Sequence, residues 1–235
     1  MKILIDGDIL AFAAASVHPD DKRMAVAKVR SLVKTSTDAC FAAEDEGEIY
    51  VKGDYNFRDE YSFYKANRAG SVRPATLEPV RAVLASMGTQ SHGGEADDFI
   101  VIRAQELFDK GEDYVISSLD KDLKQMHGKF HNYRTGDFID VTEEQGLFWL
   151  HQQCITGDST DGIPGIRGIG PKKSEKFLQL HKVEDRPPAI LELYYEHFGS
   201  RDQAFESLEA CWNCVYMRKR MEDVKILPLP KEFSL

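Results

Sequence analysis

Short apolar runs alternate with longer amphipathic segments over the first half of the chain. The runs KILI, EIYVK, YVISS and KFHNY are rich in β-branched and aromatic residues and predict strands. Three segments with helical periodicity predict helices: AVAKVRSLVKTSTDACFAA, TLEPVRAVLASM and EADDFIVIRAQELF. Strands separated by helices of this length are typical of a mostly parallel sheet with helices on both faces. We therefore expect an α/β domain over residues 1–141.

The pattern changes near Val141. The segment VTEEQGLFWLHQQCITG predicts a helix, with Thr142 and Gln145 at capping-box spacing at its start. A glycine-rich turn and further helical segments follow to about Asp223, and LPLPKEFSL predicts an extended tail. We therefore predict a helical region with a C-terminal tail over residues 142–235.

Carboxylates collect where the predicted strands end and where one helix begins. The segment LIDGD ends its strand at Asp6, VKGD ends at Asp54, and SSLDKD continues a strand into Asp120 and Asp122. The segment GGEADD opens a helix with three further acids, namely Glu95, Asp97 and Asp98. Because ligands of parallel sheets bind beyond the carboxyl ends of the strands, we expect these acids to meet there.

Each acidic motif also has an ordinary interpretation: EADD can be an acidic first turn that the helix dipole favours, and DKD a plain turn. The recurrence at several strand ends favours a shared role. Carboxylates brought together without counter-ions repel one another, and hard divalent cations remove that penalty. Oxygen ligands without a His or Cys cluster favour Mg²⁺ or Mn²⁺. Two Mg²⁺ ions, with Mn²⁺ as a substitute, would clamp a phosphodiester for hydrolysis.

The segment ITGDSTDGIPGIRGIGPKKSEKFL suggests a grip on a phosphate backbone. Asp158 and Asp161 are three residues apart and could reach one ion. The segment GIRGIGPKK predicts a tight hairpin between helices, with Pro171 at the first position of the second helix. Three glycines would allow close approach of a phosphate and three lysines add positive charge at the same end: Gly165, Gly168, Gly170, Lys172, Lys173 and Lys176.

Composition limits these interpretations. The chain has 235 residues and a formal net charge of −9, which by itself does not favour a nucleic-acid partner. Two divalent ions in an acidic pocket would cancel about four of these charges and leave local basic patches to bind. Four cysteines are too few for a disulfide framework, so we expect reduced packing cysteines, no zinc site and a cytoplasmic protein. No apolar run reaches the roughly 18 residues of a membrane span.

Taken together, the motifs LIDGD, VKGD before FYKANR, GGEADD, SSLDKDL and ITGDSTDGIPGIRGIGPKK occur in the order of the flap endonuclease and 5′-to-3′ exonuclease family. The chain resembles the short bacteriophage members of that family over roughly residues 1 to 180. The resemblance implies a PIN-like α/β nuclease domain joined to a helix-three-turn-helix module. It implies Mg²⁺-dependent hydrolysis of DNA to 5′-phosphorylated products, in phage DNA replication or RNA-primer removal and in the bacterial host cytoplasm.

The resemblance also assigns roles. The first metal ion would be held by Asp6, Asp54, Glu95, Asp97 and Asp120, and the second by Asp120, Asp122, Asp158 and Asp161, while Asp98 extends the catalytic set. Lys65 and Arg68 of YKANR would steady the scissile phosphate. The glycine-rich hairpin would bind duplex DNA and a potassium ion. The partner would be DNA with a 5′ end, flap or junction, or an RNA–DNA hybrid, bound by a monomer without a membrane.

The chain departs from the family pattern at two places. Family members often carry an arginine shortly after the first Asp-Gly, where this chain has Ala13, so a phosphate contact is either missing or supplied by Arg73 or Arg81. Only 30 residues separate Lys65 from Glu95, a short interval for an arch that threads a 5′ flap. The alternative functions are a PIN-type ribonuclease and a DNA-junction binder without catalysis.

Two further motifs have a functional and a structural interpretation. Tyr61, Phe63 and Tyr64 could stack on a terminal base or pack within the protein. The segment YMRKR, which includes Arg218, could contact DNA or form a solvated helix end.

Overall fold

The computed structural model describes residues 1–40, 46–223 and 225–234, and its contacts divide the chain into two compact units. Unit 1 comprises residues 1–56, 71–142 and 217–224, and unit 2 comprises residues 57–70, 143–216 and 225–235. The sequence analysis expected each region to be one stretch of chain. Instead, the short segment 57–70 from the first region belongs to unit 2, and the short segment 217–224 from the second region belongs to unit 1.

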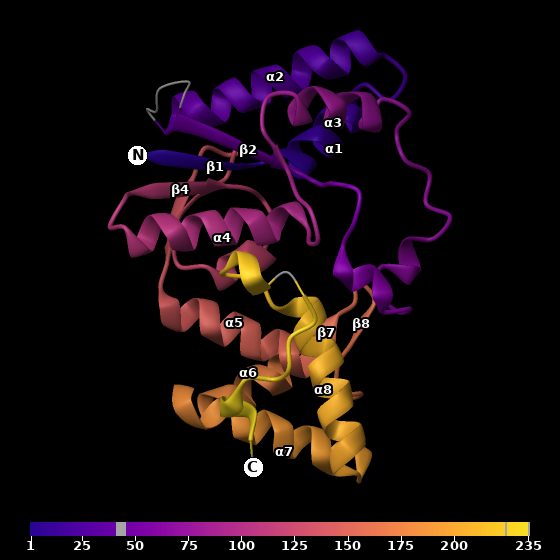
Figure 1. Cartoon of the computed structure of the whole chain (residues 1–235), viewed down its shortest axis with the longest axis vertical. Helices are drawn as coiled ribbons and strands as arrows, with labels where there is room; N and C mark the ends of the chain where they lie inside the picture. The colour runs from indigo at the N-terminus through magenta and orange to yellow at the C-terminus, as the bar shows by residue number, and fades with distance from the viewer. Residues whose placement is uncertain (41–45, 224, 235) are drawn as a thin grey trace. The chain divides into compact units, whose positions relative to one another are not determined.

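Unit 1 contains a six-stranded sheet in the order β3-β2-β1-β4-β5-β6. Figure 1 labels β1, β2 and β4 of this sheet. All neighbouring pairs are parallel except β5 and β6, which are antiparallel, so the predicted mostly parallel sheet is confirmed. The strands are β1 (Lys2–Asp6), β2 (Gly47–Val51), β3 (Thr89–Gln90), β4 (Tyr114–Ser117), β5 (Gly128–His131) and β6 (Phe138–Val141).

Helices cover both faces of this sheet, as predicted. Successive side chains of a strand point to opposite faces, so Ile3 and Ile5 of β1 pack in one hydrophobic cluster and Leu4 packs in another. The first cluster includes residues of α1 (Gly7–Val17), α2 (Lys22–Ala39) and α3 (Leu77–Ala85). The second includes residues of α4 (Ala96–Asp109) and of the short 3₁₀ helix η4 (Asp122–Gln125).

Helix α1 and strands β3 and β6 of unit 1 were not predicted. Helix α1 begins directly after β1, and the Asp6 side chain caps it by accepting a hydrogen bond from the Ile9 N–H at 3.0 Å. Its alanine-rich sequence extends the apolar run of the strand, which hides the change of period. Strand β3 consists of two exposed polar residues, and β6 is a four-residue strand that is exposed except at the half-buried Val141. The predicted end of α2 at residues 41–43 lies outside the described residues, and α2 ends at Ala39.

Unit 2 is mainly helical. Its elements are α5 (Glu143–Thr156), the antiparallel pair β7 (Gly157–Asp158) and β8 (Ile163–Pro164), α6 (Pro171–Gln179), α7 (Arg186–Phe198) and α8 (Arg201–Val215). Short 3₁₀ helices complete the description: η2 (Phe57–Glu60), η3 (Ala66–Arg68), η5 (Val183–Asp185) and η7 (Lys231–Phe233) in this unit and η6 (Met221–Asp223) in unit 1. Helix α6 begins at Pro171, as the sequence predicted.

One hydrophobic cluster joins the separate segments of unit 2. Leu150 and Cys154 of α5 pack with residues of α7 and α8, and Tyr64 of the segment 57–70 joins them. The C-terminal residues pack against this cluster as well, because Leu229 and Phe233 are buried. The predicted tail is therefore part of the core of unit 2.

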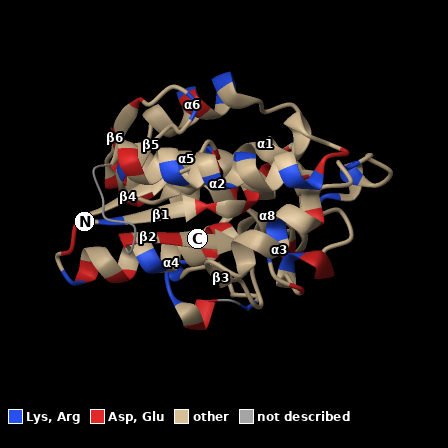
Figure 2. Cartoon of the chain, turned by 90° about the horizontal axis from the view of Figure 1, so that it is seen from above, with Lys and Arg blue, Asp and Glu red and all other residues tan. Residues whose placement is uncertain are grey.

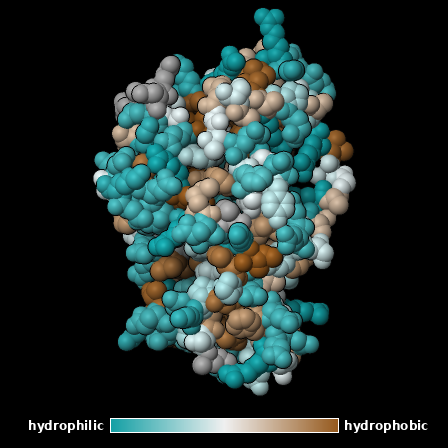
Figure 3. Space-filling model, in the orientation of Figure 1, coloured by the Kyte–Doolittle hydropathy of each residue, from teal (hydrophilic) through white to brown (hydrophobic). Residues whose placement is uncertain are grey.

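The four cysteines, Cys40, Cys154, Cys211 and Cys214, are free and buried, as expected for packing residues. Among the described residues, no helix is long and apolar enough to cross a membrane. The face shown in Figure 3 is covered mainly by hydrophilic residues.

Candidate functional site

A hydrogen-bonded chain of side chains connects the carboxyl ends of β1 and β4 in unit 1. Asp6, the last residue of β1, is 3% exposed and accepts a hydrogen bond from the Ser118 hydroxyl at 2.6 Å. The same hydroxyl accepts from the Asp120 N–H at 2.9 Å, and an Asp120 oxygen accepts from the Asp122 N–H at 2.8 Å. Neighbouring strands therefore bring Asp6 and Asp120 together, as predicted, and Ser118 joins them.

Sequence reasoning missed Ser118. The signal was present, because SSLDKD places two hydroxyl side chains directly before the acidic turn. A hydroxyl can donate one hydrogen bond while it accepts another, so Ser118 satisfies two site residues at once.

The electrostatics of Asp6 show that negative charge gathers here. Burial raises the pKa of Asp6 to about 7, although the hydrogen bonds from Ser118 and Ile9 oppose the rise. The nearby charges of Asp8 and Asp120 contribute to this raised value. An ionised Asp6 is therefore costly without a positive charge beside it.

The remaining acids of unit 1 lie in different environments. The Asp54 side chain is 86% exposed, with its Oδ1 3.4 Å from Nδ1 of His92. Glu95 precedes α4 and Asp97 lies in its first turn, both half-buried. Asp98 is fully buried, and its two oxygens accept hydrogen bonds from the N–H groups of Glu95 (2.9 Å) and Arg218 (3.1 Å). The Asp98 side chain thus links the start of α4 to the backbone of Arg218.

The ability of these residues to hold metal ions can be tested on their chemistry. Within residues 1–40, 46–223 and 225–234, no group of three or more His, Cys, Asp or Glu side chains lies in an arrangement that could hold a metal ion. The carboxylates of Asp6 and Asp120 at the strand ends are linked through Ser118. Their oxygen atoms, and the burial and neighbouring negative charges that raise the pKa of Asp6, fit a hard divalent cation.

Unit 2 brings the motifs YKANR and TGDSTDG together. Asp161 forms ion pairs with Arg68 and with Lys65, whose Nζ lies 3.6 Å from Asp161 Oδ2. Lys65 also donates its backbone N–H to the Asp161 carbonyl at 2.6 Å. Asn67 of the same motif donates to the Ser159 carbonyl at 2.9 Å. The two predicted basic residues and a predicted acid therefore share one local structure.

Two residues of this local structure have notable conformations. Lys65 is the one non-glycine residue with positive φ (54°) in the described part of the chain, and this conformation is uncommon for a residue with a side chain. Asp158 is buried and accepts from the Thr160 N–H at 2.7 Å, which shapes the turn that presents Asp161.

The glycine-rich hairpin lies between β8 and α6, and its glycines serve different needs. A Cβ on Gly165 would lie 2.1 Å from the Thr156 carbonyl carbon, so close packing of the backbone requires this glycine. Gly168 has a positive φ of 86° and, like Gly170, nothing near its missing Cβ. Lys173 donates to the Gly168 carbonyl at 2.9 Å and thereby ties the hairpin to α6.

Positive charge lies on the exposed surface of α6. Lys172 and Lys176 are exposed, and the basic positions of the chain can be followed in Figure 2. Together with the open backbone at Gly168 and Gly170, they form a surface that a phosphate backbone can approach.

Of the two ambiguous motifs, the aromatic one takes its structural interpretation and the segment YMRKR does not. Tyr64 is buried in the core of unit 2, and Tyr61 and Phe63 pack against it. Arg218 is fully buried in unit 1, so it does not lie on a solvated helix end.

Comparison with known proteins identifies similar sequences. The chain is 29% identical over 257 aligned positions to a DNA polymerase I of Deinococcus radiodurans, a match that covers 99% of this chain and 26% of the relative. It is 27% identical over 214 positions to a 5′-3′ exonuclease of Bacillus subtilis, covering 78% of this chain and 71% of that protein. The chain thus spans only 26% of the length of the DNA polymerase I. No protein-family model matches it.

A solved structure shares the fold. The bacteriophage T5 D15 flap endonuclease, in a pseudo-enzyme-product complex with DNA and metal ions, matches with a TM-score of 0.66 at 18% identity, covering 92% of this chain and 90% of that one. At this identity the likeness establishes the fold, and the predicted PIN-like α/β fold with its helical module is confirmed. The predicted resemblance to flap endonucleases and 5′-to-3′ exonucleases is confirmed by the names of the similar proteins.

Proposed function

We propose, from the resemblance to 5′-3′ exonucleases and flap endonucleases, that this chain is a metal-dependent 5′-to-3′ exonuclease and flap endonuclease that hydrolyses DNA to 5′-phosphorylated products. The observation that carries the proposal is the pairing of Asp6 and Asp120 through Ser118 at the carboxyl ends of adjacent parallel strands. Ligands of such sheets bind at these ends. The relatives named 5′-3′ exonuclease and flap endonuclease support the reaction class.

The proposal keeps the metal ligands that the family resemblance implies. Two divalent ions, Mg²⁺ or Mn²⁺, would supply charge stabilisation and a nucleophilic hydroxide near neutral pH. The residues proposed to hold them are Asp6, Asp54, Glu95, Asp97, Asp120, Asp122, Asp158 and Asp161. Ser118 keeps Asp6 and Asp120 in register by donating to the first and accepting from the second. Asp98 serves as a buried support for the start of α4.

The remaining residues bind and orient the DNA. Lys65 and Arg68 would stabilise the charge on the scissile phosphate, and Asp161 holds both of them in place. The hairpin and the lysines of α6 would bind the duplex without reading its sequence, with a potassium ion at the hairpin. A role in phage DNA replication or RNA-primer removal, as a monomer in the host cytoplasm, completes the proposal.

The test is a cleavage time course on 5′-labelled duplex DNA and 5′-flap DNA, with Mg²⁺ or with chelator, for the wild type and Asp120→Asn. We expect metal-dependent release of short products from the 5′ end, reduced by at least about 10³-fold in the variant. Cleavage of both DNAs at the wild-type rate by Asp120→Asn would refute the assigned site.

The same assay separates the alternatives. Cleavage of matched RNA but not DNA would identify a ribonuclease. Tight binding of DNA junctions without cleavage of either nucleic acid, with and without metal, would identify a binding module.

A further inference from the structure

The side chain of Asp8, two residues after Asp6, connects three elements of unit 1. Its Oδ2 accepts a hydrogen bond from the Lys52 N–H at 2.7 Å, directly after β2. Its Oδ1 accepts from Nε of Arg81 in α3 at 2.8 Å. Asp8 itself lies in the first turn of α1. Both oxygens of the second carboxylate of LIDGD are therefore committed to positions on neighbouring elements.

The sequence enforces this arrangement. A Cβ on Gly7 would lie 2.6 Å from the Tyr50 carbonyl oxygen and from a Val51 methyl group, so only glycine lets α1 begin this close to β2. Helix α3 packs in the same hydrophobic cluster as α1 through Leu77, Val80 and Leu84. Arg81 is thereby held beside the carboxyl end of the sheet.

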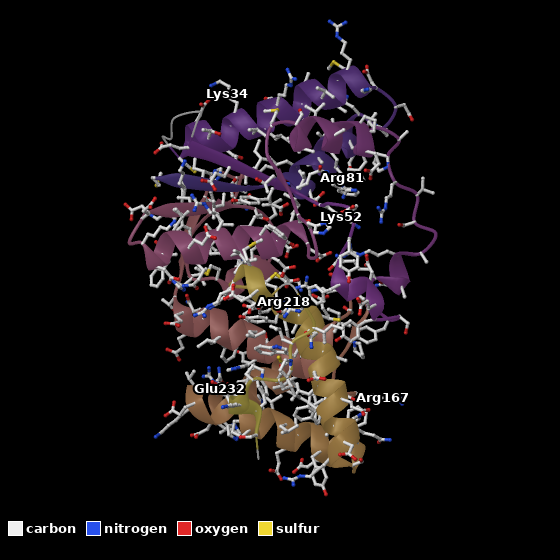
Figure 4. All side chains as sticks on the ribbon, in the orientation of Figure 1. Lys34, Lys52, Arg81, Arg167, Arg218 and Glu232 are labelled. Carbon is white, nitrogen blue, oxygen red and sulfur yellow. The ribbon has the colours of Figure 1, made fainter. Side chains whose placement is uncertain are left out.

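Two nitrogens of the Arg81 guanidinium are held by carboxylates, which fixes the orientation of the group. Its Nε binds Asp8, and its Nη1 binds Oε1 of Glu78 at 2.8 Å. The Arg81 side chain is 20% exposed. Its Nη2 has no hydrogen-bond partner among the residues that the structure describes. Figure 4 labels Arg81 and Lys52, the two residues that Asp8 connects. A guanidinium fixed at one edge presents its other N–H groups in a known direction to an anion.

A second arginine of unit 1 provides a contrast. Arg103 of α4 is 25% exposed and also binds two carboxylates. Its Nε and Nη2 both bind Glu48, at 2.8 and 3.1 Å, and its Nη1 binds Glu106 at 3.0 Å. All three of its nitrogens have partners, and Glu48 lies near the start of β2, at the opposite end of the strand. Arg103 therefore carries the same charged group as Arg81, but it has no nitrogen left to bind an anion and it does not lie at the carboxyl end of the sheet.

We propose that Arg81, positioned by Asp8, binds a non-bridging phosphate oxygen of DNA beside the acidic strand ends. The inference rests on the proposed function, and it identifies which arginine supplies the contact that the segment DILAFAAA lacks after the first Asp-Gly. Arg73, the other candidate, is exposed and forms no hydrogen bond or ion pair with a described residue, so nothing positions its charge. Asp8 is then a positioning residue.

The test pairs protein variants with substrates that lack one phosphate charge. Arg81→Gln, Arg81→Lys, Asp8→Asn and the control Arg103→Gln would be compared on 5′-flap DNA that carries a single neutral methylphosphonate at successive positions near the junction. Binding would be measured by fluorescence anisotropy in chelator, and cleavage with Mg²⁺. Urea unfolding of each variant would show that it is folded.

For unmodified DNA we expect Arg81→Gln to weaken binding by about tenfold to a hundredfold, as for the loss of a charge-assisted hydrogen bond. Arg81→Lys should recover part of this loss because it keeps the charge, and Asp8→Asn should show an intermediate loss. Arg103→Gln should change binding by less than about threefold. At one position the methylphosphonate should weaken binding by the wild type but hardly affect Arg81→Gln.

The outcomes separate this inference from the proposed function. If the wild type binds DNA but does not cleave it, the proposed hydrolysis fails while the binding cycle still decides the role of Arg81. If the losses of DNA affinity caused by Arg81→Gln and by the methylphosphonate add at every position, the proposed contact is wrong. Equal losses of affinity for Arg81→Gln and Arg103→Gln would also overturn it. Absence of DNA binding by the wild type would overturn both ideas.

Discussion

The sharpest stability prediction concerns His151, a buried histidine of α5 in unit 2. Its side chain is almost inaccessible (5% exposed), and its Nδ1 has no hydrogen-bond partner among the described residues. Burial, together with the nearby charge of Arg186, lowers the pKa of His151 from 6.5 to about 4. The folded protein therefore keeps this imidazole neutral at a pH where the unfolded chain protonates it.

The sign and size of the effect follow from proton linkage. Below pH 6.5 the unfolded chain binds a proton at His151, and the folded protein does so only near pH 4. The stability contributed by the neutral histidine is therefore complete above pH 6.5 and is lost as the pH falls. The loss is about 1.4 kcal/mol per pH unit, so the free energy of unfolding should decrease by about 2 kcal/mol between pH 7.5 and pH 5.

Urea unfolding followed by tryptophan fluorescence reports the stability of unit 2, which contains His151. The two tryptophans of the chain, Trp149 and Trp212, both belong to this unit. His151→Phe keeps an aromatic ring next to Phe233 and removes the titrating group. The difference in the free energy of unfolding between the wild type and His151→Phe should change by about 2 kcal/mol between pH 7.5 and pH 5. The exposed His197→Gln is the control and should follow the wild type. Parallel pH curves for the wild type and His151→Phe would refute the reasoning.

Three further predictions concern the hairpin, the DNA surface and the metal ligands. Gly165→Ala should destabilise unit 2 by about 2–4 kcal/mol in the same urea assay, because its Cβ would collide with the Thr156 backbone, whereas Gly170→Ala enters open space and should have little effect. Lys172→Ala with Lys176→Ala should weaken binding to all DNA sequences alike and reduce the salt slope by about 2, measured by anisotropy titrations; an unchanged slope would remove α6 from the contact. Asp6→Asn should weaken Mn²⁺ binding, followed by the EPR signal of the free ion, more than Asp161→Asn does; the reverse order would contradict the charge balance seen here.

Most of the fold of unit 1 was predictable because its signals are local. The strands β1, β2 and β4 are short apolar runs, and α3 and α4 have clear helical periodicity. Helix α1 escaped prediction because its alanines continue the apolar run of β1, so no change of period marks the boundary. The exchange of segments 57–70 and 217–224 between the units depends on contacts distant in sequence. One example is the buried Arg58, which donates to the carbonyls of Cys214 and Tyr216.

The candidate site was predictable in composition but not in its internal bonds. The position of Asp6 and Asp120 at adjacent strand ends follows from parallel topology, which the sequence indicated. Pattern alone did not show that Asp98 would be buried against backbone N–H groups while Asp54 would be exposed. The two residues have the same side chain, but Asp54 follows the end of β2 and Asp98 lies in the first turn of α4. Their difference arises from tertiary packing around the start of α4.

The acids of the two units differ in how their charge is balanced, and this difference bears on metal binding. In unit 2, Asp161 is paired with Lys65 and Arg68, so the protein itself supplies its positive charge. In unit 1, Asp8 is balanced by Arg81. Among the described residues Asp6 accepts hydrogen bonds from the neutral donors Ser118 and Ile9 alone, and burial, with the nearby charges of Asp8 and Asp120, raises its pKa. A divalent cation would therefore relieve more electrostatic strain at Asp6 than at Asp161, because at Asp161 it must first compete with two cationic side chains. The affinity of the proposed metal site should accordingly depend mainly on the strand ends of unit 1.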